Sequence, residues 1–162
     1  HLGYGLVFSA AVASLCAGAG FPGKLFFGWV SDKASIKLCM ICVIAAQFVG
    51  QFLMYLSETT GLFVVGATIF GFGVGGVVPM QGAIVGRTFG RSSFGSVLGI
   101  MRPAMFPIQI LGVPFAGLVF DEFGSYDIAF RVFLLLYLIA IVSICFYKRP
   151  VEKISETYLE AK

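Results

Sequence analysis

The chain has 162 residues, of which 59% are hydrophobic and 12% are charged, and its formal net charge at pH 7 is +3. A soluble domain could not keep this much apolar surface out of water. The cations stand between apolar segments and do not cover one polar face, which argues against a nucleic-acid-binding protein and favours a protein of the lipid bilayer.

Apolar segments dominate the chain, at residues 2–30, 38–56, 62–85, 94–120 and 128–147. Each is long enough for the roughly 20-residue helix that crosses a bilayer. None shows the period-two alternation of polar and apolar residues that a membrane strand needs. We therefore expect an all-α, polytopic bundle of five transmembrane helices over residues 1–147, followed by a cytoplasmic tail at 148–162.

The first segment carries a single charge, Lys24, which follows Pro22 and Gly23. A cation inside a membrane span is costly and is usually functional. Lys24 could bind an anionic substrate or form part of a gate, and proline and glycine would loosen the helix there. The alternative is that its long side chain snorkels to the membrane surface.

A short polar break follows, Gly28-Trp-Val-Ser-Asp32-Lys33-Ala-Ser-Ile-Lys37. Gly28 permits a close helix approach, Asp32 can face a helix N-terminus, and the lysines suit anionic lipid head groups. The pattern resembles the cytoplasmic loop signature of the major facilitator superfamily of secondary transporters, although Ser35 stands where glycine is usual. The resemblance implies gating roles for Gly28, Asp32 and Lys33.

In that superfamily the signature follows the second helix of each six-helix half. The resemblance therefore implies that these helices are the last five of a twelve-helix transporter. One further helix and the N-terminal half would precede His1. The missing half of the same protein is thus one expected partner, and the lipid bilayer is another.

The second segment contains Cys39-x-x-Cys42, and the other cysteines are Cys16 and Cys145. Spaced in this way, Cys39 and Cys42 could be a redox pair or half of a zinc site. No second pair of metal ligands accompanies them, however, and His1 is the only histidine. We expect buried structural thiols, and neither a metal nor a cofactor.

The third segment is rich in breakers of regular structure: Gly71, Gly73, Gly75, Gly76, Pro79, Gly82 and Gly86. Its Gly-x-Gly-x-x-Gly string is not a dinucleotide site, because it lies inside a membrane span and no acidic residue follows about 20 positions later. Small residues four apart instead let helices pack closely. Pro79 invites a bend, and Gln81 either lines a cavity or bonds a neighbouring helix.

The fourth segment holds Arg102 and Gln109, with Pro103 and Pro107 between them. Arg102, Phe106 and Gln109 share one helical face at i, i+4 and i+7. This face could line a substrate cavity, or Arg102 could pair with a helix outside this chain. Helix-breaking prolines are tolerated in a membrane where protein or a watery cavity satisfies the backbone, and bending elements suit alternating access.

The loops predict an orientation. One set of breaks and the tail carry Lys33, Lys37, Arg87, Arg91, Lys148, Arg149 and Lys153, whereas the other breaks carry Glu58, Asp121, Glu122 and Asp127. The positive-inside rule then places residues 31–37 and the C-terminus in the cytoplasm. No carboxylate lies inside a predicted span, so a site lined by this part of the chain would favour anions.

Three further patterns narrow the resemblance: Gly71-Phe-Gly-Val-Gly-Gly-Val-Val-Pro79, Phe89-Gly90-x-x-Ser-Phe94-Gly95, and Gly117-x-x-x-Asp121. They look like the monocarboxylate and oxalate–formate branch, in which many members carry an arginine at the position of Lys24 that is implicated in binding the carboxylate. The resemblance implies secondary active transport of a small organic anion, a mono- or dicarboxylate, by symport or antiport.

The residues that we expect to bind substrate are Lys24, Gln81, Arg102 and Gln109. Those that we expect to permit gating are Gly28, Asp32, Lys33, Pro79, Pro103 and Pro107. The alternative function is a proton-coupled exporter of drugs or other small molecules in the same superfamily. An enzyme is not expected, because no nucleophile, acid–base or metal groups converge.

Overall fold

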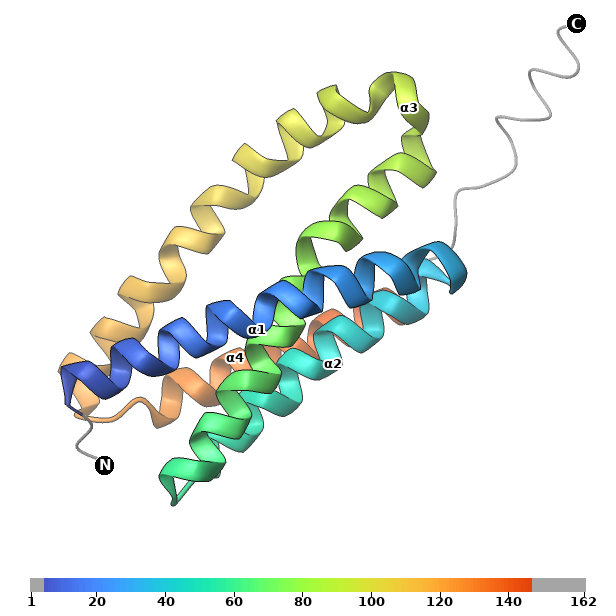
Figure 1. Ribbon diagram of the computed structural model, residues 1–162. Helices are drawn as coiled ribbons and strands as arrows, with labels where there is room; N and C mark the ends of the chain where they lie inside the picture. The colour runs from blue at the N-terminus through green and yellow to red at the C-terminus, as the bar shows by residue number, and fades with distance from the viewer. Residues whose placement is uncertain (1–4, 147–162) are drawn as a thin grey trace, which may run out of the picture.

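The computed structural model describes residues 5–146, apart from the side chain of Arg91. Its elements are α1 (Leu6–Lys33), α2 (Ile36–Tyr55), α3 (Thr60–Phe123) and α4 (Asp127–Phe146) (Figure 1). All of them are helices, so the prediction of an all-α protein is confirmed. The predicted tail at 148–162 lies outside the described residues.

Helix α3 bends back on itself at Gly90, whose backbone dihedrals are φ 73° and ψ −178°. Only glycine adopts this region readily, because it has no Cβ. The bend divides α3 into a first segment, Thr60–Gly90, and a second segment, Ser92–Phe123. With these two segments counted separately, the described chain has five helices that are long and apolar enough to cross a membrane.

The first segment of α3 is the centre of the bundle, with α1 and α2 packed against it and α4 packed against α2. Figure 1 shows the second segment running back apart from this bundle and approaching α4 only near its end. Most side chains of the second segment are accordingly exposed. Helix α3 ends at Gly124, which has a left-handed conformation with φ 64°.

Glycine allows the central helices to approach backbone to backbone. A methyl group on Gly75 would collide with the carbonyl of Gly20, and one on Gly23 with the carbonyl of Phe72. On the α2 side, a methyl group on Gly66 would lie 2.8 Å from the Gly50 carbonyl oxygen. The dense glycines of this region therefore join α1, α3 and α2 tightly.

Gly28 does not make such an approach. A methyl group there would lie 4.0 Å from Cβ of Pro79, an ordinary contact. The close approach that we expected at Gly28 occurs earlier in α1, at Gly20 and Gly23. Gly82 and Gly86 likewise face no backbone; a methyl group on either would rest 3.7–3.9 Å from the ring of Phe94, which folds back across the bend.

The prolines do not break α3. Pro79, Pro103, Pro107 and Pro114 lie inside the helix, and the break in helical dihedrals within α3 is at Gly90. Pro79 therefore does not interrupt the helical dihedrals of α3.

The cysteines differ in burial. Cys39 lies in the buried core cluster with Phe27, Val43 and Met80. Cys42 and Cys145 are exposed, and Cys16 is half-buried. The expectation of four buried thiols is therefore wrong for Cys42 and Cys145, which face outward from α2 and α4. Within residues 5–146 no group of three or more possible metal ligands comes together.

Candidate functional site

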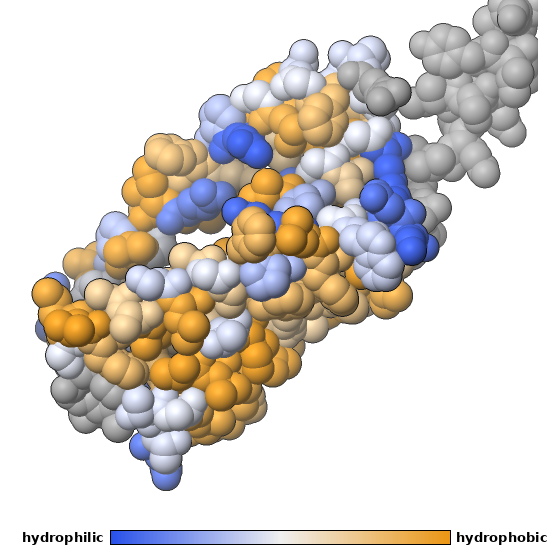
Figure 2. Space-filling model, in the orientation of Figure 1, coloured by the Kyte–Doolittle hydropathy of each residue, from blue (hydrophilic) through white to orange (hydrophobic). Residues whose placement is uncertain are grey.

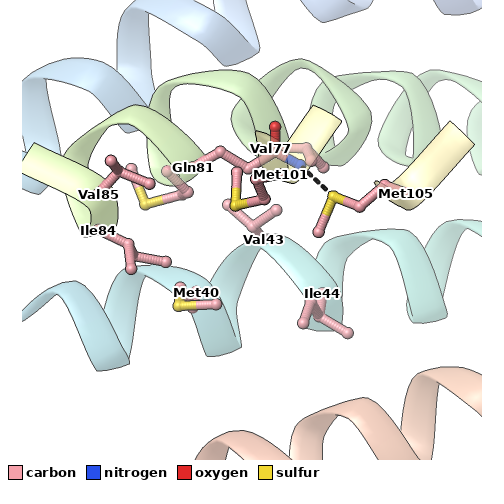
Figure 3. A pocket seen from close by; sticks show the side chains of 10 residues that line it. Met40, Val43, Ile44, Val77, Gln81, Ile84, Val85, Met101 and Met105 are labelled. Atoms are coloured by element: carbon pink, nitrogen blue, oxygen red, sulfur yellow. Dashed lines mark hydrogen bonds between the residues drawn. The ribbon is translucent and has the colours of Figure 1, made fainter. Parts of the chain in front are cut away.

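A cavity of about 220 Å³ lies between α2 and both segments of α3. Residues Met40, Val43 and Ile44 enter it from α2 (Figure 3). The first segment of α3 contributes Val77, Met80, Gln81, Ile84 and Val85, and the second segment contributes Met101 and Met105. The cavity thus lies where the second segment of α3 faces α2 and the first segment of α3.

Methionine is concentrated in this wall. Four of the five methionines of the chain line the cavity. Methionine side chains are flexible and polarisable, and their sulfur makes favourable contacts with aromatic rings. The cavity wall is therefore soft and adaptable as well as apolar.

Gln81 is the one polar side chain in this wall. Its Nε2 lies 3.7 Å from Sδ of Met105, a weak hydrogen bond that links the two segments of α3 (Figure 3). The two roles that the sequence left open for Gln81 therefore coincide in this structure: the side chain lines a cavity and also bonds a neighbouring helical segment.

Arg102 and Gln109 lie on the second segment and are exposed. At about 100° per residue, they fall within about 60° of Met105 around the helix axis. They therefore lie at the edge of the helix face that lines the cavity, and neither is one of the lining residues. Within the described residues, the guanidinium of Arg102 has no hydrogen-bond or ion-pair partner.

Lys24 lies elsewhere, exposed on α1 beside Gly23, which packs against Phe72. It does not line the cavity. Gln81 contacts the second segment of α3, which also carries Arg102 and Gln109, through its bond to Met105. No described contact joins Lys24 to these three residues. A ligand held by both cations would have to span the space between α1 and the second segment of α3.

The expected gating residues fall into separate places. Gly28 and Pro79 are neighbours across α1 and α3. Asp32 is exposed, and Nζ of Lys33 lies 4.3 Å from the centroid of the Trp29 ring, a cation–π distance. Pro103 and Pro107 are exposed on the second segment.

Arg87 and Lys37, which served in the sequence analysis mainly to predict membrane orientation, bind backbone carbonyls near helix ends. The guanidinium of Arg87 donates to the carbonyl of Ser31 near the end of α1. Nζ of Lys37 donates to the carbonyl of Cys145 near the end of α4, at 2.6 Å. The Ser31 carbonyl lies in the last turn of α1, where carbonyls have no partner within the helix and the helix dipole favours positive charge. Figure 2 shows hydrophilic surface at this end of the molecule.

At the opposite end, Nε of Arg131 donates to the hydroxyl of Tyr55 at 3.0 Å and so links α4 to α2. A second cavity of about 340 Å³ lies next to this link. Its walls include Gln51, Phe130, Phe133 and Tyr137. No sequence pattern indicated this link, because it joins residues 76 positions apart.

A comparison of the sequence with models of known protein families identifies the family of this chain. The model of the Major Facilitator Superfamily matches residues 1–161. The chain belongs to this superfamily. The expected resemblance is confirmed, and the superfamily consists of membrane transporters and not of enzymes.

Curated relatives support the monocarboxylate branch. Monocarboxylate transporter 12 of Xenopus laevis is 31% identical over 112 residues, which cover 67% of this chain and 24% of the relative. Monocarboxylate transporter 14 of Mus musculus is 29% identical over 122 residues, 74% of this chain and 24% of the relative. Low affinity inorganic phosphate transporter 4 of Petunia hybrida is 33% identical over 107 residues, 60% of this chain and 19% of the relative.

The chain spans about a quarter of the length of these monocarboxylate transporters. No solved structure matches it. The details of its site therefore come from the cavity, the cations and the packing described above.

Proposed function

We propose that this chain is the C-terminal part of a twelve-helix secondary active transporter that moves a small organic anion, a mono- or dicarboxylate, by alternating access. It would act together with an N-terminal half of the same protein, in a lipid bilayer. The relatives support the anionic cargo, since three of them are named as transporters of monocarboxylates or of inorganic phosphate.

The observation that carries this proposal is the distribution of charge. Lys24 and Arg102 lie inside spanning helices, whereas the described carboxylates lie at helix ends or in the link between α2 and α3. Cations inside membrane-spanning helices attract anions when no carboxylate lies beside them. In this proposal Arg102 and Lys24 neutralise the substrate carboxylate, and Gln81 and Gln109 donate hydrogen bonds to it.

The packing supports alternating access. The glycine-mediated contacts make α1, α2 and the first segment of α3 one tightly joined unit, which would move as a body. The second segment is held to it by few contacts, among them the weak bond from Gln81 to Met105. Gly28 and Pro79 would form a sliding contact in this motion, and Pro103 and Pro107 would lower the cost of bending the second segment.

Orientation follows from the positive-inside rule. The proposal places the turn after α1, the bend at Gly90 and the C-terminus in the cytoplasm. Arg87, Lys37, Lys33 and Asp32 would then form the cytoplasmic latch of this half, with Arg87 holding the end of α1 through the Ser31 carbonyl.

The test is uptake of radiolabelled carboxylates into proteoliposomes that contain the full-length protein. We expect Arg102→Gln and Lys24→Gln each to raise the KM more than tenfold, because a hydrogen bond to a charged group contributes about 1.5–3 kcal/mol. Arg131→Gln is the matched control, since Arg131 bonds Tyr55 at the opposite end. Normal uptake by both test variants would contradict the proposed anion site.

The apolar wall of the cavity also favours a second candidate, a proton-coupled exporter of hydrophobic small molecules in the same superfamily. That function requires an intramembrane carboxylate, which this chain does not supply within its described spans. Transport of hydrophobic cations against a proton gradient, unaffected by Arg102→Gln, would favour the exporter over the anion transporter.

A further inference from the structure

The methionine-lined cavity is unsuited to a hydrated anion. Nine of its ten wall residues are apolar, and Gln81 supplies the single amide. A bound water needs two to four polar partners, and a site with fewer remains dry or accepts an apolar group. An acid as small and polar as acetate or pyruvate would leave this space unfilled.

The cavity is open on one side, and its size sets how much of an apolar group it can cover. An engineered cavity of about 150 Å³ in another protein is known to bind benzene. The cavity here has about 220 Å³. It can therefore hold a phenyl ring together with two or three further carbons, and its thioethers favour contact with the ring edge.

Arg102 lies on the same segment as two residues of the cavity wall but is not itself part of that wall. It stands three positions before Met105, about 60° from it around the helix axis, and is exposed. Its exposed guanidinium has no partner within the described residues. A ligand with a carboxylate at Arg102 and an apolar group about one ring long would satisfy both features at once.

We infer that the transported anion carries an aromatic or other bulky apolar group, which lies in the cavity between α2 and the two segments of α3. This inference rests on the proposed function and names its substrate class. Because the cavity is built from both segments of α3, an apolar group within it contacts the tightly packed unit and the loosely held second segment together. Occupancy would thus favour the arrangement in which the second segment lies against α2.

The experiment compares the KM for uptake of radiolabelled acetate, butyrate and 3-phenylpropionate by the full-length protein in proteoliposomes, with protein-free vesicles subtracted. Each buried methylene should lower the KM about fourfold. We expect the KM for 3-phenylpropionate to be at least tenfold below that for acetate. Equal KM values across the series would overturn the inference.

Met101 provides the matched variants. Met101→Trp should narrow the cavity and raise the KM for 3-phenylpropionate to that for acetate, both measured in the same variant. Met101→Leu conserves the volume and should keep the preference. An unchanged preference in Met101→Trp would overturn the assignment of the apolar group to this cavity.

The outcomes separate this inference from the proposed function. If short carboxylates are transported without any preference for apolar groups, the inference fails and the proposed function stands. If neither an acid of the series nor the dicarboxylate succinate is transported, the proposed function fails and the inference fails with it. If the uncharged 3-phenylpropanamide is transported as well as the acid, the role of Arg102 is wrong and the exporter is favoured.

Discussion

At the scale of single residues, glycine decides how closely the helices of this chain approach. The sequence shows a dense run of glycines in α3, but only some of them touch another backbone. Gly75 meets the carbonyl of Gly20, whereas Gly82 and Gly86 face the ring of Phe94. Glycines in α3 therefore contact either a neighbouring backbone or an aromatic side chain. The contact partner determines how much an alanine substitution would destabilise the protein.

This difference gives a stability prediction. Gly75→Ala should destabilise the protein by about 1–3 kcal/mol, because the added methyl group would meet backbone that cannot move aside. Gly18→Ala is the control, since a methyl group there has no atom within 4 Å. It should be neutral or stabilise the helix by up to about 1 kcal/mol. Thermal unfolding in detergent measures both, and equal melting temperatures would contradict the close approach.

At the scale of elements, α3 contains two spans joined by a single residue of special geometry. Gly90→Ala should cost about 1–3 kcal/mol, because φ and ψ at this position lie in a region that is essentially restricted to glycine. The space around Gly90 is open, so the cost is conformational and not steric. Gly95→Ala, at a helical position with open surroundings, should show no such loss in the same unfolding measurement.

The prolines of the second segment permit a separate prediction. Pro107→Ala should stabilise the helix, because a helix-interior proline is about 3 kcal/mol less favourable than alanine. If Pro107 eases bending during transport, the variant should also show a lower turnover number at an unchanged KM. Pro114→Ala is the control, as Pro114 lies further from the cavity along the same segment. Equal turnover in wild type and Pro107→Ala would exclude a gating role for this proline.

At the scale of the whole molecule, the ends of the helices fall into two groups with different chemistry. Lys37 and Arg87 bind helix-end carbonyls at one end, and Arg131 bonds Tyr55 at the other. The cations thus have structural partners in addition to their part in topology. Lys37 ties α2 to α4, and Arg87 ties the first segment of α3 to α1.

A labelling experiment tests the orientation of the two ends. Ser35→Cys and Ser125→Cys place one thiol at each end, each in a full-length protein in which every native cysteine, including the four of this chain, is replaced by alanine. In intact cells an impermeant maleimide should modify the cysteine at 125 and should reach the one at 35 only after the membrane is opened. The reverse pattern would contradict the proposed cytoplasmic placement of residues 31–37.

Much of this architecture could be predicted from the sequence. The five apolar segments, the superfamily signature at Gly28–Lys37 and the break near Gly90 are local patterns, and the bilayer makes such patterns decisive because every backbone group must be satisfied inside a helix. The burial of the cysteines and the close approach at Gly28 were predicted wrongly. Both depend on which face of a helix meets a neighbour, and that is not a local property.

The sequence by itself determined the class of protein, the number of spans and the cations that lie within them. Only the tertiary structure decided that four methionines and Gln81 would line one cavity, that Lys24 would lie apart from it, and that Arg87 and Lys37 would bind distant carbonyls. The physical reason is that hydropathy and helix length act along the chain. Contacts between helices depend instead on how residues far apart in sequence interlock, and glycine sets that fit here by allowing backbones to touch.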